Sequence, residues 1–194
     1  MKKTTADTIK SVIVLTLISF ICVGLLSICN VFLRYVPTLD ADMAKQLYKV
    51  CPTGEATDEN ALEYFEILDN ERQIKAVNKA NKSTGGEVLA VYKAKKGTNE
   101  GRYIVQAQAN GRDGAIIMLT AFDENNKIMK TICYSQNESF WTKIDESWFD
   151  KLIGQDSAIT GNDIQASSGA TLSLNAIAKA ITISGVMINE ITGA

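Results

Sequence analysis

The sequence predicts an α+β protein in which an antiparallel sheet is packed with helices and preceded by one apolar helix. Residues 11–33 carry no charged side chain, which is typical of a membrane span. Four short apolar runs between residues 88 and 134 are joined in pairs by turn-rich connectors, as in antiparallel hairpins. Helical patterns lie before and after these runs, and this arrangement favours the α+β class.

Length and charge narrow the possible functions. The 194 residues suffice for one domain plus an anchor, and the net charge of −2 predicts no broad basic surface for nucleic acid. The chain has no histidine, so it lacks the commonest general base and transition-metal ligand. We therefore expect no catalytic residues and no metal site, and redox chemistry would require a bound cofactor.

The N-terminal apolar run, residues 11–33, is long enough to cross a bilayer as a helix. Three lysines precede it and two aspartates follow it closely. The positive-inside rule therefore places residues 1–10 in the cytoplasm and the domain after Tyr35 outside an inner or cell membrane. A cleaved signal peptide would need a shorter run with small residues at its end. A lipoprotein would use Cys29, but Ile28 stands where a small residue is expected.

Residues 37–86 are expected to form a helical lead-in to the domain. Helical patterns cover residues 40–49 and 58–82, and the second begins with acidic residues, as the helix dipole favours. Polar residues and two glycines at 81–86 then end the pattern.

Residues 87–194 are expected to form the main domain. Its two hairpins have connectors at residues 95–101 and 123–127. The four predicted strands are Val88–Ala94, Tyr103–Ala109, Ala115–Phe122 and Ile128–Tyr134.

A last helix is predicted over about residues 172–191. Its apolar stripe repeats at three- and four-residue steps and is interrupted by Ser184. The stripe consists of Leu174, Ile177, Ile181, Ile188 and Ile191. Lys179 and Glu190 also lie in this segment, so we expect a core helix and not a second membrane span.

A short motif, residues 168–173, stands directly before this last helix. Gly169 and Ala170 allow the backbone to approach a ligand closely, and Thr171 is expected to begin the helix. The N–H groups of a helix start have no partner within the helix and attract anions such as phosphate. The alternative is an ordinary helix cap, because serine and threonine are favoured there.

The motif resembles the S/T-G-A-T-x-S/T signature of the FMN-binding domain family. That family includes the G subunit of the Rnf electron-transport complex and the C subunit of the sodium-translocating NADH:quinone reductase. Its motif threonine carries FMN through a phosphoester bond, so the resemblance implies covalent FMN on Thr171. The other cofactor-binding residues that the motif implies are Ser168, Gly169, Ala170, Leu172 and Ser173.

Two further segments resemble this family. Residues 111–118 match its G-x-x-G-x-I entry to a strand. Residues 137–141 stand where the family has E-T-P-G-L-G against the flavin, so Glu138 and Ser139 are implied as cofactor-binding. The proline and glycines of that loop are missing here. An aspartate that often precedes S-G-A-T is replaced by Gln165.

Phe140 and Trp141 follow in the same loop and leave two interpretations open. Either ring could offer an apolar wall to a flavin or pack into the core. The sequence likewise leaves open whether Cys51 and Cys133 form a disulfide.

The resemblance implies an electron-transfer subunit of an Rnf-type, ion-translocating ferredoxin:NAD oxidoreductase. Its partners would be the other membrane subunits and a separate flavin transferase that attaches the FMN. The short chain favours this subunit over its relative in the sodium-translocating quinone reductase. Two alternatives are a membrane-anchored assembly or ligand-binding module without redox activity, and a stand-alone flavin-linked reductase.

Overall fold

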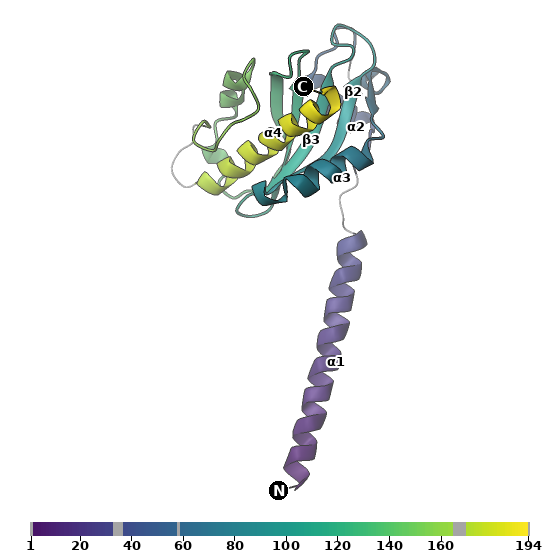
Figure 1. Cartoon of the computed structure of the whole chain (residues 1–194), viewed down its shortest axis with the longest axis vertical. Helices are drawn as coiled ribbons and strands as arrows, with labels where there is room; N and C mark the ends of the chain where they lie inside the picture. The colour runs from purple at the N-terminus through teal and green to yellow at the C-terminus, as the bar shows by residue number, and fades with distance from the viewer. Residues whose placement is uncertain (1, 33–36, 58, 165–169, 194) are drawn as a thin grey trace. The chain divides into compact units, whose positions relative to one another are not determined.

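The computed structural model describes residues 2–32, 37–57, 59–164 and 170–193 of the chain (Figure 1). The chain divides into two compact units, Met1–Val36 and Pro37–Ala194. Leu33, the last residue of the predicted span, and Asp58, the first of the predicted second helix, lie outside the described residues.

The first unit contains helix α1, Lys2–Phe32. Its segment Lys10–Ser27 has a mean hydropathy of 2.2 and no residue buried within the structure, so it is a candidate membrane span, as the sequence predicts. Side-chain hydroxyls in this segment donate to carbonyl groups one turn back, Thr16 to Val12 at 2.8 Å and Ser19 to Leu15 at 2.9 Å. Polar groups bonded within their own helix are suited to a hydrocarbon environment.

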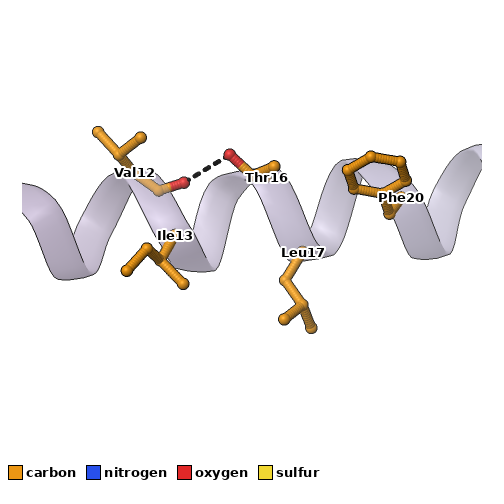
Figure 2. A pocket seen from close by; sticks show the side chains of 5 residues that line it. All are labelled: Val12, Ile13, Thr16, Leu17 and Phe20. Carbon is orange, nitrogen blue, oxygen red and sulfur yellow. Dashed lines mark hydrogen bonds between the residues drawn. The ribbon is translucent and has the colours of Figure 1, made fainter.

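Figure 2 shows a shallow hollow along the side of α1. Its lining is exposed and apolar except for the Thr16 hydroxyl, which is bonded to Val12. Acyl chains could cover such a surface, and it offers nothing to orient a polar ligand. The lining residues are Val12, Ile13, Thr16, Leu17 and Phe20.

The second unit is an α+β domain built on a five-stranded antiparallel sheet in the order β1-β2-β3-β4-β5. Its strands are β1 Phe65–Ile67, β2 Gly86–Ala94, β3 Tyr103–Asn110, β4 Ala115–Phe122 and β5 Ile128–Ser135. Its helices are α2 Ala41–Val50, α3 Glu71–Ala80 and α4 Thr171–Thr192. Short 3₁₀ turns occupy Ala61–Tyr64, Lys82–Thr84, Trp141–Lys143 and Glu146–Leu152. The predicted fold class and the four predicted strands are confirmed.

The helical prediction for residues 58–82 is wrong in its first half. Residues 61–64 form a 3₁₀ turn, β1 follows, and α3 begins only at Glu71. Strand β1 pairs with β2, with Phe65 opposite Ala94, and the Phe65 side chain is buried. The backbone groups of β1 are thus hydrogen-bonded to β2 and not within a helix. This pairing joins distant residues, so no local sequence pattern predicts it.

The sheet separates two hydrophobic cores. Helices α3 and α4 cover one face, and α4 runs across β3 with α3 beside it (Figure 1). Helix α2 packs on the other face against β4 and β5. Helix α4 is long and apolar enough to cross a membrane, but 67% of it is buried in the domain. It is therefore the core helix that the sequence predicts.

The helix α4 is buried more fully than its predicted stripe suggests. Ser184, which interrupts the stripe, is buried too, and its hydroxyl donates to the Ala180 carbonyl at 2.8 Å. This face of α4 can therefore be buried, because the Ser184 hydroxyl keeps a hydrogen-bond partner within the helix.

Two cysteines of the domain are free and belong to different faces of the sheet. Cys51 is buried in the core under α2, whereas Cys133 on β5 packs against the α4 core. Burial raises the pKa of the Cys51 thiol to about 11 and that of Cys133 to about 12. Both therefore remain protonated at neutral pH and pack as small apolar groups.

Candidate functional site

The side chain of Glu138 joins three segments that are far apart in the sequence. Its Oε1 accepts hydrogen bonds from the backbone N–H groups of Asp113 at 2.9 Å and Gly114 at 3.3 Å. Its Oε2 accepts from the N–H of Arg112 at 3.2 Å and from the hydroxyl of Ser173. The residue is only 7% exposed. We call Glu138, its three amide donors and the Ser173 hydroxyl the carboxylate cradle.

Gly111 leaves room for this carboxylate. A Cβ atom at residue 111 would lie 2.5 Å from Oε1 of Glu138 and 3.0 Å from Cδ1 of Ile116. A Cβ atom at Gly114 would have no neighbour within 4 Å. The turn closes with the N–H of Gly111 donating to the Gly114 carbonyl at 2.8 Å. Only the first glycine of G-x-x-G is therefore required by the packing of the cradle.

The cradle keeps Glu138 ionised. Burial by itself would raise the pKa of this carboxyl. The hydrogen bonds from Ser173 and from the three backbone N–H groups outweigh burial and lower the pKa below its ordinary value. The four hydrogen bonds stabilise the negative charge of this buried carboxylate. They also leave it little capacity to accept further hydrogen bonds from a ligand.

The loop that carries Glu138 is held on both sides of this residue. The N–H of Ser139 donates to Oδ2 of Asp113 at 2.8 Å, and the N–H of Glu138 donates to Oε1 of Gln136 at 2.6 Å. The hydrogen bonds from the backbone and hydroxyl of Ser139 lower the pKa of the Asp113 carboxyl. These hydrogen bonds thus hold the loop in place, although it lacks the proline and glycines expected from the resemblance.

Helix α4 begins at Thr171, as predicted. Its N-cap residue is Ala170, which has no side-chain acceptor, and in the part of the chain that the structure describes no side chain caps the first turn. Thr171 is the first helical residue and not the N-cap, whereas the alternative that the motif 168–171 is an ordinary cap stays open, because residues 165–169 lie outside the described residues. The N–H groups of this turn have no acceptor within the helix and can bind an anion. Ser168, Gly169 and Gln165 lie outside the described residues.

The side chains of this first turn point in different directions. Thr171 is exposed, and Leu172 beside it is 59% exposed. Ala170 and Ser173 are buried, at 1% and 2% exposure. Thr171 thus lies on the outer side of this turn, next to an exposed apolar side chain, while Ser173 faces the protein.

The two aromatic residues of the loop differ in their surroundings. Trp141 packs against the α4 core, and its Nε1 donates to Oε1 of Glu146 at 2.6 Å. The Phe140 ring is half-buried and lies 4.7 Å from Cζ of Arg112 and 4.5 Å from Nζ of Lys143. Trp141 is therefore a partly buried residue at the margin of this core, whereas the Phe140 ring contacts two cationic side chains near the cradle.

The structure brings together most of the predicted site residues that it describes. Ser173 and Glu138 are in contact, Ser139 is clamped beside them, and Thr171 lies in the same helical turn as Ser173. The amide donors at 112–114 were not predicted as part of the site. Among the described residues, no group of histidine, cysteine, aspartate or glutamate side chains could hold a metal ion.

Comparison with known families identifies a domain that spans these residues. Residues 111–183 match the model of the FMN-binding domain. The match begins at the turn glycine and includes Glu138, Thr171 and Ser173. The comparison with curated proteins gives no match.

Proposed function

We propose that the FMN-binding domain matched by residues 111–183 carries FMN as a phosphoester on Thr171 and transfers electrons outside the cytoplasm. The match supports FMN as the cofactor and an electron-transfer role. One observation supports the choice of residue: Thr171 is exposed at the first position of α4, and no side chain of the described residues caps this helix.

The residues around Thr171 fit such a group. The first turn of α4, which no described side chain caps, offers N–H donors and the positive end of a helix dipole to a phosphate. Arg112 and Lys143 add positive charge near the cradle, and exposed Leu172 offers apolar surface to an isoalloxazine ring. Ser168 and Gly169, which lie outside the described residues, are proposed as further cofactor-binding residues. The flavin would supply the redox chemistry, and the protein would bind and orient it.

Attachment requires a separate flavin transferase. The Thr171 hydroxyl would lose its proton and form an Oγ–P bond while the pyrophosphate bond of a flavin dinucleotide breaks and a nucleoside monophosphate leaves. Threonine is a weak nucleophile without a neighbouring base, and this chain has no histidine to act as one. The base is therefore assigned to the transferase.

The proposal is tested on the full chain made with and without a flavin transferase. With the transferase, its intact mass should increase by the mass of FMN minus one water, and the denatured chain should remain fluorescent. Without it, the chain should be colourless. A chain that stays unmodified with an active transferase would contradict the proposal and favour an assembly or ligand-binding module.

We further propose that this chain is the flavin subunit of an Rnf-type ferredoxin:NAD oxidoreductase that translocates ions. The candidate span supports a membrane location, and the FMN-binding domain supports a role in electron transport. Copurification of the tagged chain with integral membrane redox subunits from native membranes would support it. The sodium-translocating quinone reductase is the alternative complex, and a chain that purifies alone in its loaded form would point to a stand-alone reductase.

The proposed topology has the N-terminus in the cytoplasm and the domain outside. Lysines before the span and aspartates after it support this orientation. A reporter enzyme that is active only outside the cytoplasm, fused after Ala194, should therefore be active, and a cytoplasmic reporter at the same place should not. The reverse pattern of activity would overturn the topology.

A further inference from the structure

The resemblance implied that Glu138 and Ser173 touch the cofactor, but both side chains are directed into the protein. Glu138 is 7% exposed and Ser173 is 2% exposed, and they are bonded to each other. The carboxylate also accepts from three backbone N–H groups of the 112–114 turn. With four donors in place, it has little left to offer a flavin.

The hydrogen bond between Ser173 and Glu138 also affects Thr171, because both Ser173 and Thr171 belong to the first turn of α4. Ser173 is the third residue of α4, and Thr171 is the first. No side chain among the described residues caps this helix start, and a helix start without a cap is prone to fray. The hydrogen bond from Ser173 to Glu138 ties the first turn to the sheet through the β3–β4 turn.

We propose that Glu138 is a positioning residue that acts through Ser173 and holds the first turn of α4 so that the Thr171 hydroxyl is presented for flavin attachment. This inference rests on the proposed function of Thr171. The hydroxyl that Glu138 contacts is that of Ser173 and not the reacting one of Thr171. Its burial also keeps Glu138 away from a flavin bound at the surface. The lowered pKa of Glu138 agrees with it, because an ionised carboxylate is the stronger acceptor for the Ser173 hydroxyl.

Ser173→Ala and Glu138→Gln separate this role from a general loss of structure. Ser173→Ala removes the donor on α4 and leaves the bonds from the 112–114 turn to Glu138 in place. Glu138→Gln keeps the shape of the side chain and removes its charge. Ser184→Ala is the matched control, since this serine is equally buried on α4 but bonds only within the helix, to Ala180.

Hydrogen exchange of the full, flavin-free chain in detergent gives the first readout. Loss of a charge-assisted hydrogen bond should speed exchange of the amides at 174–177 by roughly tenfold or more, with the strand amides still protected. Ser184→Ala should leave these four amides as slow as in the wild type. Unchanged exchange in Ser173→Ala, or faster exchange across the whole sheet, would overturn the inference.

The rate of flavin attachment at saturating transferase gives the second readout. Misplacement of the hydroxyl should slow attachment about tenfold to a hundredfold in Ser173→Ala and Glu138→Gln. Attachment at the wild-type rate in both variants would overturn the positioning role. A wild-type chain that takes up no flavin would instead overturn the proposed function, and the exchange data would still show whether Glu138 holds the first turn.

Discussion

Thr171→Ala is expected to abolish covalent flavin completely, while the domain stays folded. Thr171 is exposed, so removing its hydroxyl and methyl group costs little packing, and alanine is a better helix former. The nearest described hydroxyl in the same turn, that of Ser173, is buried and bonded to Glu138 and cannot replace it. In-gel fluorescence and intact mass of the chain made with the transferase measure the loss.

Thr171→Ser is the matched variant, because it keeps a hydroxyl at the first position of α4. It should retain attachment, at a reduced rate if the methyl group helps to orient the oxygen. Peptide mapping of the wild type should find the FMN mass on the fragment that contains Thr171. Covalent flavin in Thr171→Ala, mapped to another residue, would show that the site is assigned wrongly.

Gly111→Ala is expected to have the second-largest effect, on stability and on flavin attachment together. The added methyl group would lie 2.5 Å from Oε1 and 2.8 Å from Cδ of Glu138, so the buried carboxylate would have to move. Overpacking of this kind costs about 1–3 kcal/mol, and the loss of part-buried hydrogen bonds from the 112–114 turn to Glu138 adds to this cost. Thermal unfolding should show a Tm lower by about 5 °C or more.

Gly114→Ala provides the control in the same turn. A Cβ atom there meets nothing within 4 Å, and the N–H of residue 114 is retained for Glu138. Its Tm should stay close to that of the wild type. Equal Tm values for Gly111→Ala and Gly114→Ala would show that Glu138 does not pack against the first glycine as described.

Local patterns were sufficient for much of the fold. The four strands were predictable because apolar runs and turn-rich connectors are properties of adjacent residues, and the hairpins pair strands that are neighbours in the sequence. The start of α4 at Thr171 was predictable for the same reason. Strand β1 was not predictable, because its three residues pair with residues of β2 that lie 25 to 29 positions further along the chain.

The sequence by itself determined the apolar N-terminal helix, the antiparallel sheet, the core helix and the threonine that matches the flavin signature. Each of these depends on residue types at short, regular spacings. Only the tertiary structure decided that Glu138 and Ser173 face inward and bond to each other, and that Gly111 makes room for them. The donors of the cradle are 24 to 35 positions from Glu138 in the sequence. Whether this carboxylate contacts a ligand or three backbone N–H groups therefore depends on how distant turns pack.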